Sequence, residues 1–243
     1  MNRADIKTEL DVILHDPSVS SSFDSWINDE LDRLSYQFDF PQLRLKTPAS
    51  LTTNNTTWQY NLTAATHASS YVFQKKLWKW TNDLFETGGR IDTDIQIIDE
   101  IDPDHNDIGD DVQRIAYELD GRNNAILATW PMATDVLSLW FYRKPTALTA
   151  DTQFPDFLPD EHVSDVLIPR IVLRAFRLYP EIAAEIAGDN TRALALWEAK
   201  YQAGLYGSNG RIGLIDTLRK SKPVRQRGPR PGMGLAGADR FAR

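Results

Sequence analysis

An acidic segment is the clearest candidate for binding chemistry in the 243-residue sequence. Residues 92–111 (DTDIQIIDEIDPDHNDIGDD) contain nine carboxylates and no lysine or arginine. Carboxylate oxygens are the ligands that Ca²⁺ prefers, and an EF-hand loop starting at Asp104 would place Gly109 correctly at its sixth position. The same alignment puts Ile108 and Ile115 at the fifth and twelfth positions, where oxygen ligands are needed. The segment therefore has the pattern of a solvated acidic loop rather than a calcium site.

The other catalytic and metal-binding patterns are weak. No histidine lies at the short spacing from another that a helical zinc site needs; the four are His15, His67, His105 and His162. Residues 160–162 (DEH) combine two acids with a histidine, but adjacent helix positions point in different directions. Residues 207–213 (GSNGRIG) lack the Lys-Ser/Thr pair of a phosphate-binding loop, and the absence of cysteine excludes disulfides and thiolate chemistry. We therefore expect no catalytic residue, no metal and no cofactor.

Aromatic and basic side chains alternate at two places. These are residues 78–80 (WKW) and 140–144 (WFYRK). Such interleaving suits the stacking of nucleic-acid bases. On strands, however, the same alternation places aromatic side chains in a core or a subunit interface, and this interpretation is favoured.

Basic residues gather at the C-terminus. From Arg219 to Arg243 there are eight basic residues and one acid, a charge of +7, whereas the whole chain carries −7, so the rest carries −14. The segment is rich in Pro and Gly and cannot bury enough apolar surface to offset the entropy of ordering. We expect an extended tail that binds a protein partner, with direct phosphate binding or a solvated, disordered end as the alternatives. Its candidate binding residues are Arg219, Lys220, Lys222, Arg225, Arg227, Arg230, Arg240, Phe241 and Arg243.

The elements at both ends of the chain are predicted to be helical. Apolar residues recur at helical spacing over 3–14, and again after a Ser-rich connection from Ser21 or Ser22 to Pro41. Helical spacing returns at residues 158–161 (LPDE), a typical helix start. Pro169 should kink this helix or delay its start, and Tyr179-Pro180 ends or kinks it. A last helix capped by Asp189 or Asn190 should weaken at the glycines from position 204 onward.

The middle of the chain has the alternation and turn residues of short strands. The Gly/Asn-rich residues 120–124 between two apolar runs predict a hairpin. We expect a strand and then a short helix in 71–86, and strands in 43–46, 58–62, 91–98, 112–119, 125–130 and 136–142.

These elements predict an α+β fold: a helical bundle (an N-terminal hairpin plus two C-terminal helices), an antiparallel β-rich insertion and an extended tail. The predicted boundaries are a helical core at 1–41 and 158–218, an insertion at 42–157 and a basic tail at 219–243. The composition, 42% apolar and 25% charged, is that of an ordinary soluble domain. No apolar run approaches the roughly 18 residues of a membrane span, and no signal peptide opens the chain. We expect a protein made in a cytoplasm, with no membrane partner.

The order of these pieces resembles the head-to-tail adaptor (connector) proteins of short-tailed bacteriophages. In that pattern a last strand leads through an aspartate and a Pro-x-Leu-Pro sequence into a long helix. Here Phe157 slightly expands the motif. The matching residues are Tyr142, Pro145, Leu148, Asp151, Pro155, Leu158 and Pro159.

The resemblance implies a non-enzymatic virion protein at the head-tail interface, assembled in the host cytoplasm. About twelve copies would form a ring beneath the portal protein and continue the DNA channel. The basic tail would reach the portal, and the insertion would face downstream tail or nozzle proteins. Double-stranded DNA would pass through the lumen without specific binding, because an acidic body repels phosphates. The large insertion and the acidic loop depart from the simplest helical adaptors.

Two other function classes are compatible with parts of the sequence. A nucleic-acid-binding accessory protein would use the tail and the Trp/Lys segments, and its affinity would fall steeply with salt. A carbohydrate- or metal-dependent enzyme built on the acidic loop would need carboxylates converging in a pocket.

Overall fold

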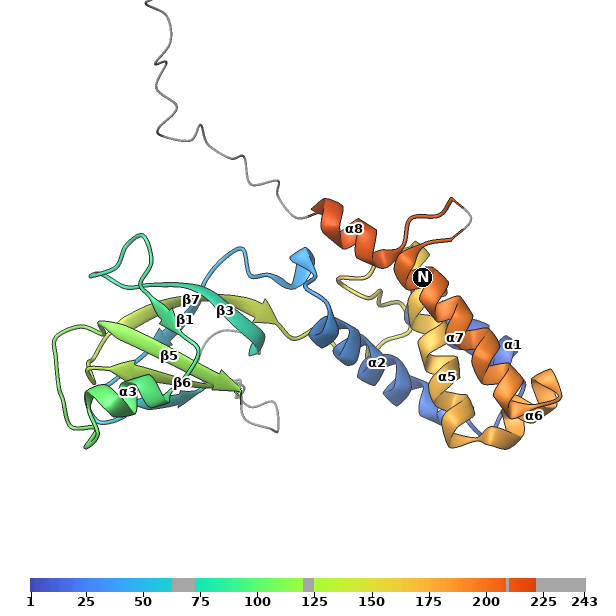
Figure 1. Cartoon of the computed structure of the whole chain (residues 1–243), viewed down its shortest axis with the longest axis horizontal. Helices are drawn as coiled ribbons and strands as arrows, with labels where there is room; N and C mark the ends of the chain where they lie inside the picture. The colour runs from blue at the N-terminus through green and yellow to red at the C-terminus, as the bar shows by residue number, and fades with distance from the viewer. Residues whose placement is uncertain (63–72, 120–124, 209, 222–243) are drawn as a thin grey trace, which may run out of the picture.

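The computed structural model describes residues 1–62, 73–119, 125–208 and 210–221. The chain forms two units that lie at opposite ends of its long axis (Figure 1). Of the described residues, those in 1–43 and 144–221 belong to the helical unit and those in 45–143 belong to the β unit. Each unit has its own cluster of buried apolar side chains.

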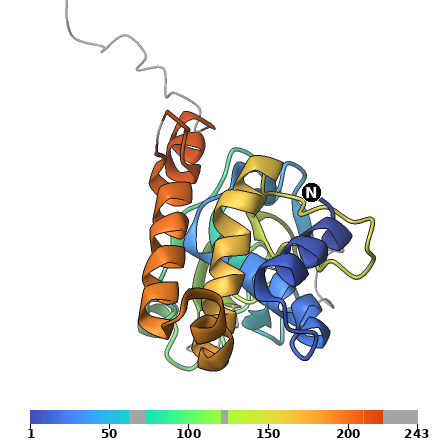
Figure 2. The ribbon, with the colours of Figure 1, turned by 90° about the vertical axis from the view of Figure 1, so that its right-hand side faces the viewer.

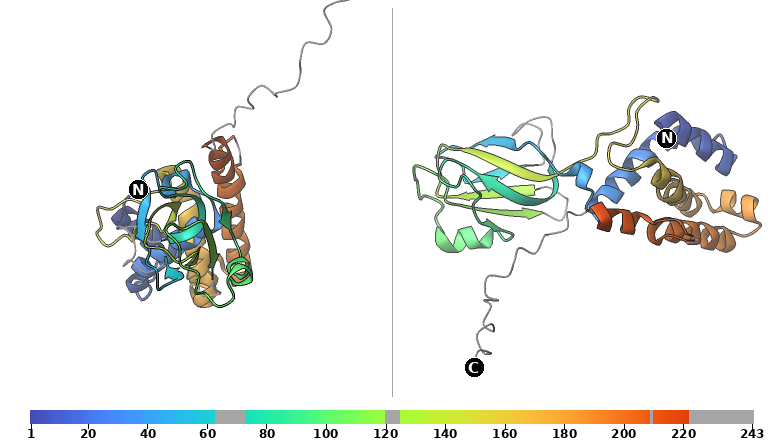
Figure 3. Two further views of the ribbon diagram at one scale, coloured as in Figure 1. Left: turned by 90° about the vertical axis from the view of Figure 1, so that its left-hand side faces the viewer. Right: turned by 90° about the horizontal axis from the view of Figure 1, so that it is seen from above.

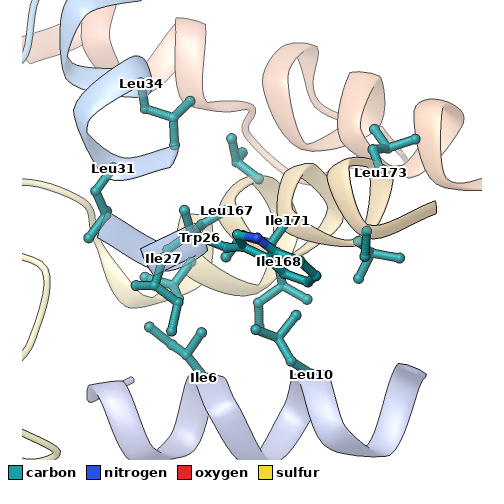
Figure 4. Close-up of a cluster of buried hydrophobic side chains, with 14 of the residues drawn as sticks. Ile6, Leu10, Trp26, Ile27, Leu31, Leu34, Leu167, Ile168, Ile171 and Leu173 are labelled. Carbon is teal, nitrogen blue, oxygen red and sulfur yellow. The ribbon is translucent and has the colours of Figure 1, made fainter. Parts of the chain in front are cut away.

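The helical unit is built around one central helix, α5. Figure 2 shows α5 between α7 on one side and α1 on the other, and Figure 4 shows side chains of α1, α2 and α5 meeting in the core. The elements are α1 (Arg3–Leu14), α2 (Phe23–Gln37), α4 (Asp160–His162), a π-helical turn (Val163–Leu167), α5 (Ile168–Leu178), α6 (Pro180–Ala187), α7 (Asn190–Tyr206) and α8 (Leu214–Ser221). On α5 the fully or almost fully buried side chains are Ile168, Ile171, Val172, Leu173 and Phe176.

A proline and a glycine allow α7 to approach the start of α5 closely. Pro169 has no N–H to donate to the carbonyl of Asp165, four residues earlier, and the chain there forms the π-helical turn. A Cβ atom on Gly204 of α7 would lie 1.9 Å from that carbonyl oxygen. Glycine at 204 is therefore required by close packing of the two backbones.

The β unit packs two sheets against each other. One has strand order β1-β7-β3 and the other β2-β6-β5-β4; all pairs are antiparallel except β4 with β5. The strands are β1 (Ala49–Thr52), β2 (Gln59–Asn61), β3 (Phe73–Thr81), β4 (Ile91–Asp92), β5 (Arg114–Leu119), β6 (Ala125–Trp130) and β7 (Val136–Arg143). Both sheets contribute to the buried cluster, in which Trp80 is fully buried and donates its indole N–H to the carbonyl of Arg90 at 2.9 Å. The right panel of Figure 3 shows this unit beside the helices.

Polar contacts join the two units where α2 ends against β3. The side chain of Gln74 donates to Ser35 at 2.6 Å. The ammonium of Lys75 donates to the carbonyls of Tyr36 and Phe38 at 3.0 and 2.6 Å. Burial lowers the pKa of Lys75 below its ordinary value, and the carboxylate of Asp39, 3.1 Å from the ammonium, only partly opposes this shift. The carbonyls at the end of α2 that have no hydrogen-bond partner within the helix thus accept from a side chain of the other unit.

Most predicted elements are confirmed, as is the α+β class. The structure contains the N-terminal helical hairpin, the strands near 58–62 and 136–142, and the antiparallel pair 112–119 with 125–130. The turn predicted at 120–124 lies outside the described residues. Pro169 is the second residue of α5 and directly follows the π-helical turn, so it lies at the start of a helix, which is one of the two expected outcomes. The C-terminal part has additional helices, α6 and α8, beyond the two expected.

The strand predicted at 43–46 is wrong. Residues Pro41–Leu43 form a 3₁₀ turn, and Arg44 makes a single bridge with Tyr142. Leu43 is buried in the helical unit and Leu45 in the β unit. The alternation of apolar residues therefore marks the crossing between two cores, not one face of a strand.

One strand expectation and one helix expectation are also corrected. After the short β4, residues Gln96–Ile101 form helix α3, because Ile95 and Ile98, three residues apart, are buried on the same side against the sheet. The short helix expected after β3 does not form; instead the side chain of Asn82 accepts the N–H of Phe85 in a turn at 2.8 Å. Side-chain hydrogen bonds of this kind compete with helix formation.

We expect Gly204→Ala to destabilise the protein by about 1–3 kcal/mol, because the added methyl group must push α7 away from the Asp165 carbonyl. Helix propensity alone predicts the opposite sign, a gain of about 1 kcal/mol. Urea unfolding of the variant distinguishes these results. Ala199→Gly, at an exposed position of the same helix, is the control and should lose about 1 kcal/mol. A stabilised Gly204→Ala variant would contradict the close approach.

Candidate docking surfaces

The segment that follows β7 is fastened to the helical unit. Leu148, within the predicted insertion 42–157, is buried in the helical core. The amide of Asn28 on α2 holds its backbone at two points: Oδ1 accepts the N–H of Leu148 at 2.7 Å, and Nδ2 donates to its carbonyl at 3.2 Å. The position of the segment is thus fixed by a side chain distant in sequence.

Arg3 provides the second attachment. Its guanidinium donates to the carbonyl of Thr149 at 2.6 Å and forms an ion pair with Asp24 on α2. It also lies 3.5 Å from the carboxylate of Asp151, and its backbone N–H donates to the carbonyl of Gln153 at 2.8 Å. The exposed Asp151 therefore links the segment to α1.

The residues of the predicted strand-to-helix junction pack and pair within the folded protein. Phe157 packs edge-on against Phe40 with ring centroids 4.5 Å apart, and Arg143 forms an ion pair of 2.7 Å with Asp156. Leu148, Pro155 and Leu158 are buried, whereas Tyr142, Pro145 and Pro159 are half-buried. The motif thus forms a folded seam between the units.

The first residues of the predicted tail, 219–221, are helical. Arg219 and Lys220 belong to α8 and are exposed, with the guanidinium of Arg219 lying 3.6 Å from Asp216. Leu214 and Leu218, one helical turn apart, hold α8 on the helical core: Leu214 is fully buried, and Leu218 is partly buried against the same cluster. The other predicted tail residues lie outside the described residues: Lys222, Arg225, Arg227, Arg230, Arg240, Phe241 and Arg243.

α8 is anchored to the start of the π-helical region by His162. This side chain is only 2% exposed, and its Nε2 lies 3.1 Å from the hydroxyl of Thr217 on α8. Burial lowers the pKa of His162, although the carboxylates of Glu161 and Asp165 act in the opposite direction. The neutral imidazole therefore predominates at pH 7.

The two aromatic and basic clusters are brought together on one sheet. Trp80 is in the core, but Trp78 and Trp140 lie side by side with ring centroids 6.3 Å apart. The guanidinium of Arg44 covers the ring of Trp78 at 3.5 Å, and the ammonium of Lys79 lies 4.8 Å from the ring of Trp140. Cations of the same chain thus already occupy these ring faces.

The acidic segment is folded rather than simply solvated. It includes α3, and it buries two carboxylates, Asp92 and Asp102. The ring of His105 stacks on Trp58 with centroids 3.6 Å apart. Within the described residues no group of three or more acidic or histidine side chains is arranged to hold a metal ion.

An arginine cluster was missed by the sequence analysis. Glu30 on α2 is 1% exposed, and its carboxylate accepts hydrogen bonds from Arg33, Arg170 and Arg174. Arg170, Arg174 and Arg177 recur at the spacing of one helix face, which was a readable signal. The partner of these arginines is 140 residues away in sequence, so the convergence itself was not readable.

We expect the free energy of unfolding to fall between pH 7 and pH 5, partly through His162. In the unfolded chain this residue binds a proton near its ordinary pKa of about 6.5, whereas the folded protein resists protonation until lower pH. The unfolded state then binds more protons in this window, so stability rises with pH. In urea unfolding, His162→Gln should have a flatter pH profile than the unmodified chain. An unchanged profile for His162→Gln would contradict this assignment.

Comparison with known proteins supplies the family. No helix among the described residues is long and apolar enough to cross a membrane. A search of curated proteins finds no match to the chain. The family model described as SU10 adaptor protein matches residues 1–227, which include both units, the seam and α8. The resemblance to phage adaptor proteins is thereby confirmed, and the chain belongs to the SU10 adaptor protein family.

Proposed function

We propose that this protein is a structural, non-enzymatic part of the virion that joins the phage head to the tail. About twelve copies form a ring beneath the portal protein and continue the DNA channel. The family match over residues 1–227 is the observation that carries this proposal. The seam supports it, because an adaptor needs its two units joined through fixed contacts such as those of Gln74 and Lys75 with the end of α2.

The basic tail is the proposed portal-docking segment. It follows α8, which is fixed to the helical unit by Leu214 and by the contact between His162 and Thr217. A segment that starts from an anchored helix has a defined origin, which raises its effective concentration at a nearby partner. Its positive charge suits an acidic surface on the portal.

The β unit is the proposed contact for downstream tail or nozzle proteins. It lies at the end of the molecule opposite α6 and α7 (Figure 1). The charge of −14 carried by residues 1–218 favours passage of DNA through the ring without binding, since acidic walls repel phosphates.

We expect a chain that ends at Ser221 to lose portal binding by at least about tenfold, because charged contacts dominate its docking. The cut keeps α8, whose Leu218 packs against the helical core. The tagged chains would be purified from host cells during virus production, and the mass and stoichiometry of the complexes measured. The full chain should yield a large complex near one-to-one with a single partner. A full-length chain with Arg225, Arg227 and Arg230 changed to Gln is the matched control for charge.

A small protein without a partner at any stage would contradict the adaptor proposal. Tight DNA binding by the full chain that depends on the tail and weakens steeply with salt would instead favour the nucleic-acid-binding accessory protein.

A further inference from the structure

A cleft on the helical unit concentrates guanidinium groups without a matching number of acids. It has a volume of about 540 Å³ and lies between α2, α5 and α7. Four arginines line it with two glutamates, Glu30 and Glu198, and Arg174 also pairs with Asp29 at 2.8 Å, so the arginines still outnumber the acids around them. The arginines are Arg33, Arg170, Arg174 and Arg177.

The arginines in this cleft are held in place before any ligand arrives. Arg170 is fixed by Glu30 and also donates to Gln37 at 2.8 Å and to the hydroxyl of Tyr201 at 3.0 Å. Arg33 and Arg177 at the rim keep 59% and 68% of their side chains exposed. Fixed guanidiniums lose little entropy on binding a carboxylate, and they bind it in a planar, bidentate geometry.

The cleft also has apolar walls. Leu173 and Leu178 line it, and Leu178 is 55% exposed although it is a large aliphatic residue. The cleft therefore fits a segment in which carboxylates flank an aliphatic side chain. A DNA duplex fits less well, because Arg170 and Arg174 are recessed between helices, with 20% and 23% of their side chains exposed.

The chain itself has a segment of this chemistry on its other unit. Ile108 is 65% exposed, and the acids Asp107 and Asp110 on either side of it are exposed as well. Two backbone hydrogen bonds with Met132 of the β unit hold this segment. The N–H of Gly109 donates to the carbonyl of Met132 at 3.0 Å, and the N–H of Met132 donates to the carbonyl of Asp107 at 2.9 Å. Both surfaces are thus ordered in the free chain, which lowers the entropic cost of contact.

We propose that residues 104–111 of one copy dock into the arginine cleft of a second copy. The acidic segment and the cleft belong to opposite units of the chain (Figure 1), so one molecule offers both halves of a head-to-tail contact. Repetition of such a heterologous contact generates a closed ring when the rotation between copies closes. This inference rests on the proposed ring and names the surfaces that build it.

Charge reversal of each half tests the pairing. The cleft variant is Arg33→Gln with Arg177→Glu, which leaves Arg170 and Arg174 on Glu30. The loop variant is Asp107→Lys with Asp110→Lys. Arg192→Glu and Asp83→Lys, at exposed positions outside both surfaces, are the matched controls. Circular dichroism and thermal unfolding of each full-length variant verify that it folds.

Self-association is measured by sedimentation velocity over a concentration range, with and without the portal protein. Each variant alone should associate at least about tenfold more weakly than the unmodified chain, since it places like charges opposite each other. An equimolar mixture of the two variants should regain association, because each acidic surface again meets a basic one. The two controls should behave as the unmodified chain does.

Other outcomes overturn the proposal in distinguishable ways. If both variants associate as the unmodified chain does, or if folded variants are not rescued by mixing, the contact lies elsewhere and the ring proposal stands. If the unmodified chain does not associate, alone or with the portal, both proposals fail. If the cleft variant assembles normally but loses binding to duplex DNA, the cleft is a nucleic-acid site.

Discussion

The burial of α5 positions the rest of the helical unit. Its side chains at 168, 171, 172 and 176 are almost completely excluded from water, and α1, α2 and α7 each cover part of the helix. Each such side chain contributes roughly 1.5–3 kcal/mol when fully buried. The positions of α1, α2 and α7 therefore depend on their packing against α5. The π-helical turn before it and the glycine of α7 beside it are local adjustments that allow close contact.

Charged side chains of α5, Arg170 and Arg174, contact Glu30 of α2. Glu30 is buried, and three arginines share its carboxylate. A buried ion pair of this kind is weak evidence for stability, since desolvation opposes the Coulomb attraction. Its clearest effect is geometric: it holds Arg170 and Arg174 of α5 at fixed positions, whereas Arg33 and Arg177 at the rim keep more than half of their side chains exposed.

The seam between the units connects this core to the β unit. Arg3 and Asn28 hold the segment after β7 on the helical side, and Lys75 satisfies the end of α2 from the β side. The junction motif is therefore explained by packing and hydrogen bonding.

The sequence alone determined the α+β class, the helical hairpin, most strands and the phage adaptor family, because these depend on local periodicity and on residues close together in the chain. It was wrong at Leu43 to Lys46, where alternation arose from two different cores, and at Ile95 and Ile98, whose β-branched side chains lie at the start of a helix and in it. The tertiary structure alone decided that α8 extends past Arg219, because His162 and the core hold it from a distant part of the chain. It also decided that Glu30 meets Arg170: contacts across 140 residues depend on how whole helices pack, which no local pattern encodes.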